Sequence, residues 1–384
     1  MNRIDKWFPA HRHHLYILCC WAAANGCYLW QTGIVLDGES EKYIYQSQQL
    51  LATGSVTTPN FWLYATQILL ISASTSMGAG YYGVIAVQLL FNLLAVRAFY
   101  RLTGNWFHKN AALAATLLLI LNYPMQRFNT HLYTESLYYS FTILFSAFLL
   151  QISRLTFRNI VIIIAALAII SVTRPTGILF VPPALLYLFF RFFNMLKQRT
   201  KLVITTAAAV VFLFFLNLAL GSGGEFDFML PYQYEQIICG VPTVATPVTI
   251  HTAENPNSVY GLLYYLTHNF SQFARLAWER SLAFFGLIRS YYSGAHNALL
   301  VLMFYPVYVL VLAGMKHWVR RLPLQLLYIA GVVLITWASV MLTCDDWHNR
   351  FFMAIAPWLF LLSLPLVSRL FQHQGQSSAA EGTN

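Results

Sequence analysis

The feature that most limits what this chain can fold into is a series of apolar stretches almost free of charge. Only 9% of its 384 residues are Asp, Glu, Lys or Arg, whereas a soluble domain carries about 25%. Inside a bilayer the backbone must satisfy its own hydrogen bonds, so stretches of this kind form helices. The sequence therefore predicts an all-α, polytopic membrane protein.

Ten stretches are predicted to cross the membrane, and the first is expected to be retained because no small-residue cleavage site follows it. The ten stretches are 15–33, 81–100, 110–123, 136–152, 160–172, 177–190, 202–220, 298–315, 324–343 and 352–367. The shorter stretch 61–74 is expected to lie along the membrane surface. We predict a single domain over residues 1–371, with large loops at 34–80 and 221–297, and a disordered tail at 372–384.

Charge placement predicts which side each loop faces. With the N-terminus inside, the inner segments hold 16 of the 23 basic residues, and the outer segments hold 11 of the 13 acidic ones. This bias follows the positive-inside rule, so the net charge of +10 reports topology and indicates no nucleic-acid partner. The expected location is a bacterial plasma membrane, among membrane lipids, with the large loops in the periplasm or exterior.

The stretch 36–54 in the first outer loop gathers charge where little is expected. Asp37, Glu39 and Glu41 lie within five positions, and Tyr43 and Ser47 follow on one helical face. The pattern predicts an amphipathic helix with carboxylates at its N-terminus. Helix capping is the alternative explanation, but a cap needs only one acid.

Four further motifs fall at expected outer positions. They are Thr134-Glu135-Ser136, Thr173-Arg174-Pro175-Thr176-Gly177, Arg289-Ser290-Tyr291-Tyr292-Ser293, and His348-Asn349-Arg350-Phe351 followed by Pro357. Together with Gly38-Glu39-Ser40 and Tyr43, their order resembles the GT-C class of membrane glycosyltransferases. Its nearest relatives by motif are the dolichyl-phosphate-mannose protein mannosyltransferases and the lipid A aminoarabinose transferase group.

The resemblance implies an enzyme that moves a sugar from a polyprenyl-phosphate donor to a lipid, glycan or protein acceptor at the outer membrane face. A single displacement would invert the anomeric centre. The family position aligned with Glu39 is usually Asp, so Glu39 and Asp37 are alternative catalytic bases. Arg174 and Arg350 are expected to bind the phosphodiester, because a guanidinium offers a planar fork of donors.

Further substrate contacts are expected from six other residues on this face. These residues are Tyr43, Glu135, His131, His348, Tyr291 and Tyr292. A divalent metal shared by Glu39 and Glu135 is left open, because hard cations prefer carboxylate oxygens. No other cofactor is indicated, since Walker and Rossmann glycine patterns are absent from the sequence.

Each of these residues also has a structural explanation. Arg350 can pair with Asp345 or Asp346, Glu135 can cap its helix, the histidines can pack, and the two tyrosines can belong to an aromatic belt. Cys239 and Cys344 are predicted on the same face and are a candidate disulfide. The alternative functions are a polysaccharide polymerase or ligase, and a transporter or flippase of lipid-linked sugars.

Overall fold

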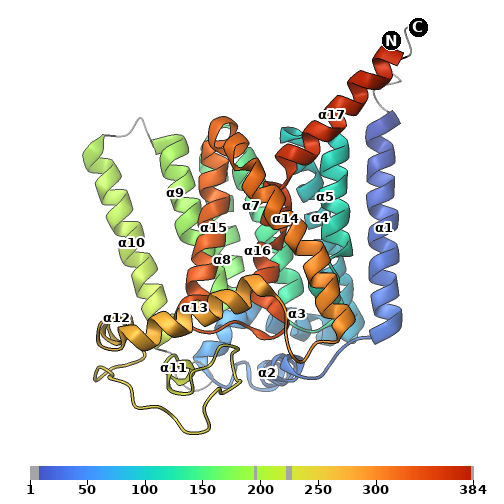
Figure 1. Cartoon of the computed structure of the whole chain (residues 1–384). Coiled ribbons are helices and arrows are strands. Elements are labelled where there is room, and N and C mark those ends of the chain that lie inside the picture. Colours follow the sequence, from blue (N-terminus) through green and yellow to red (C-terminus); the bar gives the residue numbers. More distant parts are fainter. Residues whose placement is uncertain (1–7, 194–196, 222–226, 382–384) are drawn as a thin grey trace. The chain divides into compact units, whose positions relative to one another are not determined.

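The computed structural model describes residues 8–193, 197–221 and 227–381, and helices account for most of them (Figure 1). Within these residues the only β-type pairings are two isolated bridges, between Val35 and His131 and between Ile238 and Asp345. The prediction of an all-α fold is therefore confirmed.

Backbone contacts divide the chain into two compact units. Unit 1 comprises residues 1–177, 306–323 and 356–384, and unit 2 comprises 178–305 and 324–355. Helices α14 and α16 each contribute to both units. The prediction of one functional domain over 1–371 stays a prediction.

Unit 1 holds the helices of the N-terminal half. They are α1 (Phe8–Thr32), α2 (Glu39–Thr53), η1 (Pro59–Tyr64), α3 (Ala65–Ser76), α4 (Gly80–Trp106), α5 (Lys109–Leu121), α6 (Tyr123–Gln126), η2 (Arg127–Thr130), α7 (Glu135–Gln151) and α8 (Phe157–Thr173), with α17 (Leu364–Glu381) from the C-terminus. Helix α17 reaches into the tail that was predicted to be disordered.

Unit 2 holds most of the later helices. They are η3 (Pro175–Phe180, which begins in unit 1), α9 (Val181–Phe192), α10 (Gln198–Leu220), α11 (Leu230–Gln233), α12 (Val259–His268), α13 (Phe270–Gly286), α15 (Pro323–Leu342) and η5 (Trp347–Asn349), together with parts of α14 (Gly294–Arg321) and α16 (Arg350–Leu362).

Eight of the ten predicted crossing stretches each lie mainly on one α-helix, whereas 177–190 runs over η3 and α9, and 352–367 runs over α16 and α17. Among the described residues, six helical stretches are long and apolar enough to cross a membrane: 80–106, 175–192, 198–218, 294–321, 323–342 and 347–372. Helices α5 and α8 are apolar but shorter. The chain is thus an integral membrane protein by composition and length, and the count of ten crossings stays a prediction.

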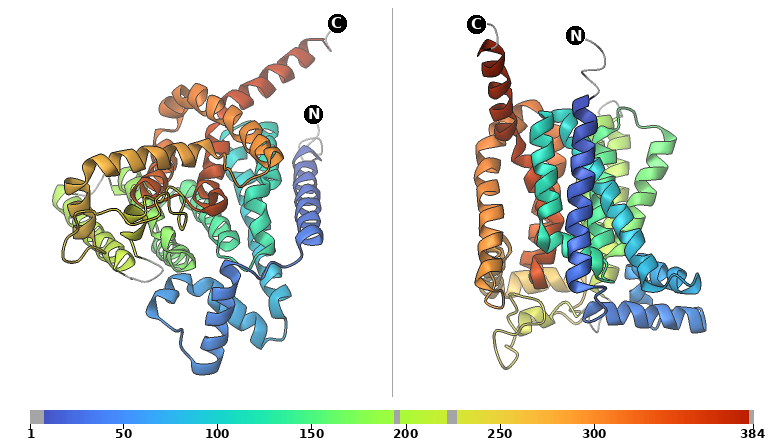
Figure 2. Two further views of the ribbon diagram at one scale, coloured as in Figure 1. Left: turned by 60° about the horizontal axis from the view of Figure 1, so that its bottom comes forward. Right: turned by 90° about the vertical axis from the view of Figure 1, so that its right-hand side faces the viewer.

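The helix predicted in the first outer loop exists and lies across the end of unit 1. Helix α2 begins after Gly38 and ends at Gly54, a left-handed residue whose N–H donates to the Leu50 carbonyl (2.9 Å). It runs across the axis of α1 (Figure 2). Tyr43 packs with Ile68 of α3 and Val84 of α4 in one core cluster, so α2 is fixed to the helices of unit 1.

The two ends of unit 1 differ in charge. One end carries four acidic residues: Asp37, Glu39, Glu41 and Glu135. The segment before α2 meets η2 at this end, where the Val35 N–H donates to the Thr130 carbonyl (2.9 Å). We call this the acidic end. At the opposite end, α4 carries Arg97 and Arg101, the α7–α8 connection carries Arg154, and the start of α8 carries Arg158; we call this the basic end.

The large loop of unit 2 contains three helices. The longest, α13, runs across the axis of α15 (Figure 1). Its Arg280 is fully buried and donates to the carbonyls of Pro231, Gln236 and Met341, which ties α13 to α11 and to the end of α15. The glycine-rich start of this loop, Gly221-Ser222-Gly223-Gly224, falls largely on residues 222–226, outside the described residues.

Candidate functional site

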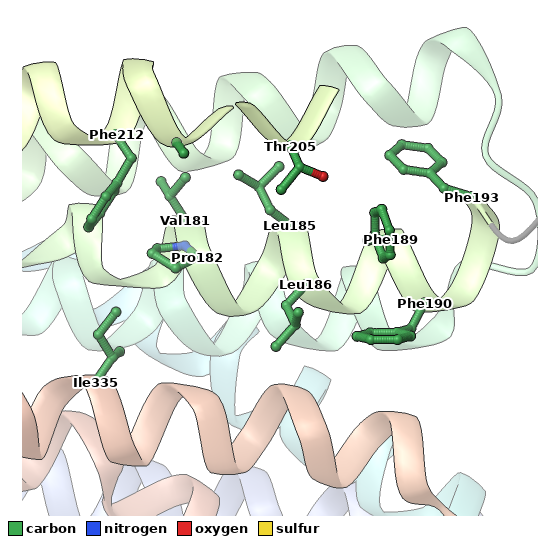
Figure 3. Close-up of a pocket in the computed structure, with 11 residues that line it drawn as sticks. Val181, Pro182, Leu185, Leu186, Phe189, Phe190, Phe193, Thr205, Phe212 and Ile335 are labelled. Atoms are coloured by element: carbon green, nitrogen blue, oxygen red, sulfur yellow. The ribbon is translucent and has the colours of Figure 1, made fainter. Parts of the chain in front are cut away.

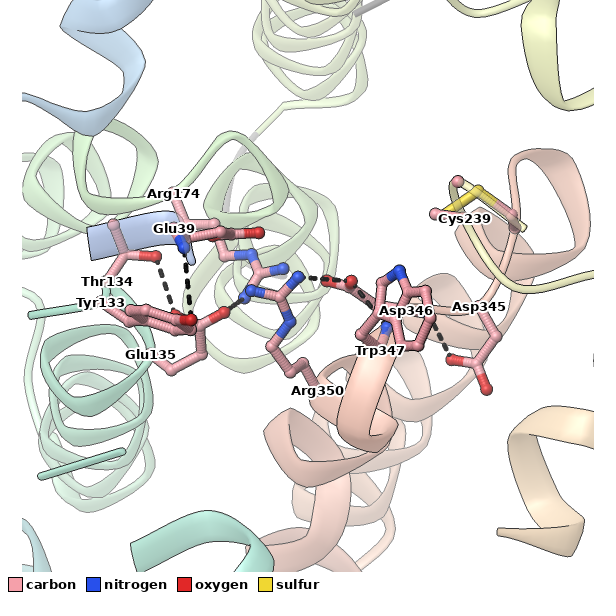
Figure 4. Close-up of polar contacts among 12 residues, drawn as sticks. Glu39, Tyr133, Thr134, Glu135, Arg174, Cys239, Asp345, Asp346, Trp347 and Arg350 are labelled. Carbon is pink, nitrogen blue, oxygen red and sulfur yellow. Dashed lines mark hydrogen bonds and ion pairs between the residues drawn. A yellow bond between two sulfur atoms is a disulfide. The ribbon is translucent and has the colours of Figure 1, made fainter. Parts of the chain in front are cut away.

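Glu39 follows a turn that requires glycine. Gly38 has φ +59°, and a Cβ on it would lie 2.5 Å from the Tyr133 hydroxyl oxygen. That hydroxyl accepts a hydrogen bond from the Glu39 backbone N–H (3.2 Å) and donates to the Asp37 carbonyl (3.4 Å). Tyr133 thereby fixes the backbone from which the Glu39 side chain projects (Figure 4).

The Glu39 carboxylate is partly accessible and has defined neighbours. Its side chain is 31% exposed, and its Oε2 accepts from the Tyr43 hydroxyl (3.3 Å) and lies 3.8 Å from the Lys42 ammonium. Burial, reinforced by the Glu39 charge, raises the pKa of Tyr43 well above its usual value, so this phenol stays a proton donor. The Asp37 side chain is exposed and has no hydrogen bond or ion pair with a described residue.

Behind Glu39 lies a buried ion pair between two of the predicted residues. Glu135 opens α7 and is fully buried, and one of its oxygens pairs with Arg174 Nη1. The other oxygen accepts from the Thr134 hydroxyl (3.3 Å). Arg174 follows α8, and 10% of its side chain is exposed (Figure 4). The predicted residues Glu39, Tyr43, Glu135 and Arg174 thus share the acidic end.

The same arrangement argues against a metal shared by Glu39 and Glu135. Both Glu135 oxygens already have partners, and one partner is the Arg174 cation. Within the described residues, no three His, Cys, Asp or Glu side chains are grouped so that they could hold a metal ion.

His131 is packed into the turn beside this cluster. It is 6% exposed, and its ring stands edge-on to Tyr133 with centroids 5.2 Å apart. Buried Gln88 of α4 donates to the carbonyls of Phe128, Asn129 and His131 (3.4, 3.3 and 2.9 Å). Gln88 was not singled out from the sequence, although an amide in the middle of a long apolar helix is a recognisable signal. A substrate role for His131 stays a prediction.

Unit 2 carries a second group of charges, in the turn 344–350. Arg350 pairs with Asp346 (2.6 Å), and Asp345 pairs with Arg289; all four residues are buried. Burial raises the pKa of Asp345 to about 7, although the Arg289 cation opposes the rise. Arg350 thus forms one of its two possible structural pairs, the pair with Asp346.

This turn is fastened to the loop at 237–239. Cys239 and Cys344 form a disulfide with Cα atoms 5.2 Å apart, which confirms the candidate pairing. The Asp345 N–H donates to the Ile237 carbonyl, and the Cys239 N–H donates to the Asp345 carbonyl (2.8 Å each). The charged turn is therefore held by one covalent and two backbone bonds.

Aromatic rings gather next to this turn. Tyr291 is 42% exposed and lies 5.1 Å from Trp347 by ring centroids. Tyr292 stacks on His296 (4.0 Å, 4° between planes) and lies 6.1 Å from His348. We call these five residues the aromatic platform. Trp347 and His296 were not identified from the sequence, although the first adjoins the His348 motif.

An apolar cavity lies elsewhere in unit 2, between α9, α10 and α15 (Figure 3). Its volume is about 430 Å³, and Leu185, Phe189, Phe212 and Ile335 are among the residues that line it. Thr205 supplies the one hydroxyl among those lining residues. An apolar lining of this kind is suited to bind a hydrocarbon chain.

Comparison with known proteins gives one family match and two structural likenesses. The model of the Alg9-like mannosyltransferase family matches residues 48–222. ArnT from Cupriavidus metallidurans, solved bound to undecaprenyl phosphate, is 14% identical with a TM-score of 0.48, over 96% of this chain and 63% of that one. Its apo form is 15% identical with a TM-score of 0.47, over 97% and 62%.

This chain thus spans less than two thirds of the length of ArnT. A comparison with curated protein sequences gave no match. The family match covers α4, α5, α7 and α8 completely, and it includes Glu135 and Arg174 but not Glu39. It confirms the predicted resemblance to the GT-C class of glycosyltransferases.

Proposed function

We propose that this protein is a membrane glycosyltransferase that moves a sugar from a polyprenyl-phosphate donor to an acceptor at the outer face of the membrane. The acidic end of unit 1 is the face that carries the chemistry. The observation on which the proposal rests is the partly exposed Glu39 carboxylate, set on a Tyr133-locked turn in front of the buried Glu135–Arg174 pair. The Alg9-like family match supports the reaction class.

Glu39 acts as the general base. Its carboxylate is exposed enough to reach an acceptor hydroxyl or amine, and the Tyr43 hydrogen bond and Lys42 orient it. The acceptor, deprotonated as it attacks, forms a bond to the anomeric carbon while the bond to the phosphate oxygen breaks. A single displacement of this kind inverts the anomeric centre.

The leaving phosphate needs cationic help, and we assign this role to Arg174, which shares the acidic end with Glu39. Its pair with Glu135 orients the guanidinium, whose planar fork of N–H donors matches the geometry of a phosphate. Arg350 of unit 2, held in the same way by Asp346, stays a predicted phosphodiester ligand. An arginine held in this way can bind a phosphate oxygen directly, without a metal ion.

Two surfaces of unit 2 have the chemistry to bind parts of such a substrate. The aromatic platform offers ring faces to a sugar or to a glycan acceptor, and the cavity between α9 and α10 offers hydrocarbon walls to a prenyl chain. Neither surface determines which sugar is transferred or which acceptor receives it.

The experiment is mass spectrometry of envelope glycans and lipids from cells with the gene, without it, and without it but complemented by the Glu39→Gln chain. We expect one glycosylated product to disappear on deletion and to return only with the wild-type chain. Unchanged glycans and lipids in all three strains would overturn the proposal. If the product vanishes while its lipid-linked sugar accumulates on the inner leaflet only, the chain is a flippase.

A further inference from the structure

The basic end of unit 1 contains a cavity that the proposed reaction does not use. It has a volume of about 750 Å³ and lies between α4, α7 and the start of α8. Arg97 and Arg101 of α4 line it one helical turn apart, and Ser153 faces them from the α7–α8 connection. Unlike Arg174 in the same unit, neither guanidinium has a hydrogen bond or ion pair with any described residue.

Two apolar grooves lead away from these arginines. The first, of about 370 Å³, lies between α4, α7 and α8 and shares Leu144 and Phe148 with the basic cavity. The second, of about 230 Å³, lies between α1 and α4, with Ile17 and Leu18 in its wall, and shares Arg97 with the basic cavity. Arg97 therefore stands where a polar cavity meets two separate apolar grooves.

The depth of the cavity suits a lipid headgroup. Helix α4 ends at the half-buried Trp106, and tryptophan is enriched where a bilayer meets water. Arg97 and Arg101 lie one to three helical turns before Trp106 in α4. Arginines so placed keep their stems in hydrocarbon and direct the guanidinium toward the headgroup layer.

We infer that this site binds one anionic diacyl phospholipid of the leaflet at the basic end, with its phosphate on Arg97 and Arg101 and its two acyl chains in the two grooves. A guanidinium pair with no carboxylate partner is complementary to a phosphate. The two grooves that meet at Arg97 match a lipid with two chains, whereas a polyprenyl phosphate has only one. The site lies at the end of unit 1 opposite Glu39, so it is distinct from the proposed active site.

The test is native mass spectrometry of the full chain in detergent with dioleoyl phosphatidylglycerol, and with dioleoyl phosphatidylcholine as the uncharged comparison. We expect the wild-type chain to retain one phosphatidylglycerol and to discriminate against phosphatidylcholine. Arg97→Gln with Arg101→Gln should weaken phosphatidylglycerol binding by about tenfold or more, because two charge-assisted contacts are lost.

Arg154→Gln with Arg158→Gln is the matched control. It removes two exposed arginines four positions apart at the same end, outside the residues that line the cavity, and should leave binding unchanged. Equal loss in both double variants would show a general charge effect and overturn the site. Wild-type binding in Arg97→Gln/Arg101→Gln would overturn it as well.

Two further measurements fix the nature of the ligand. Inorganic phosphate at millimolar concentration should not displace phosphatidylglycerol, and dihexanoyl phosphatidylglycerol should bind more weakly than the dioleoyl lipid. Displacement by phosphate, with no dependence on chain length, would identify a free-anion site and overturn the lipid. Since lipid is detected directly, the result does not depend on glycosyltransferase activity.

Discussion

The charged groups around Glu39 and those around Asp345 are built in opposite ways. In unit 1 a carboxylate with 31% of its side chain exposed stands in front of a buried ion pair. In unit 2 both carboxylates are buried, both are paired with arginines, and a disulfide adjoins them. The difference teaches that paired, buried charges position other groups, while a reactive carboxylate must keep access to its substrate.

The sharpest way to break this comparison is Glu39→Gln, which keeps the side-chain size and removes the charge. Loss of a general base typically slows turnover by about 10²–10⁴-fold, and donor binding should survive. Turnover of a polyprenyl-phosphate sugar by the purified chain is the measurement. Glu41→Gln, in the same helical turn but exposed, is the control and should be active. An active Glu39→Gln beside an inactive Asp37→Asn would make Asp37 the base.

The next largest effect is expected at the buried pair of unit 1. Glu135→Gln leaves the Arg174 charge without its partner, and breaking a buried pair typically costs about 3–5 kcal/mol of stability. Denaturant unfolding in mixed micelles measures the loss. The double variant Glu135→Gln/Arg174→Gln should lose much less stability than the sum of the losses in the two single variants. Strict additivity would show that the two side chains do not act as a pair.

Removing the Cys239–Cys344 disulfide tests whether the stability of unit 2 depends on this bond. Replacing Cys239 and Cys344 by serine should lower the stability of unit 2 by about 2–4 kcal/mol. Limited proteolysis of the 227–259 region, with and without reductant, reports the effect locally. Cys19→Ser with Cys27→Ser removes two free, exposed thiols as the control. If reductant leaves the cleavage pattern of the wild-type chain unchanged, the bond does not hold this loop.

Arg350→Lys tests whether Arg350 binds the phosphate of the donor or only forms the structural ion pair with Asp346. Lysine keeps the charge but loses the planar fork, so the apparent donor constant should rise by about tenfold, which corresponds to one charge-assisted hydrogen bond. The acceptor constant should stay the same. A variant with normal donor affinity but a lower folded fraction would assign Arg350 to the Asp346 ion pair alone.

The smallest effect is expected at the turn before Glu39. Gly38→Ala forces a side chain into a backbone conformation reserved for glycine and against the Tyr133 hydroxyl, at a cost of about 1–3 kcal/mol. Turnover should fall with stability. Tyr133→Phe added to Gly38→Ala removes the clashing oxygen and should restore part of the stability. Full wild-type behaviour of Gly38→Ala would show that the turn is not fixed as described.

The sequence was sufficient to predict the helical class, and its motifs were sufficient to bring Glu39, Tyr43, Glu135 and Arg174 to one face. It did not reveal Tyr133, whose contact with Glu39 spans 94 positions and follows no local period. Arg280 was also missed, because an arginine in an amphipathic helix is usually exposed, whereas here three carbonyls enclose it. Such contacts depend on tertiary packing, which residue spacing does not encode.

The separation of the two bonded cysteines has a consequence for how the protein is made. Cys344 is synthesised 105 positions after Cys239, and α14 and α15 lie between them. The bond can therefore form only after both of these helices have left the ribosome and entered the bilayer. Until then the first thiol must wait reduced or in a temporary bond with another thiol. Formation of the disulfide in unit 2 is thus a late step of biogenesis. A chain arrested before residue 344 would lack this bond.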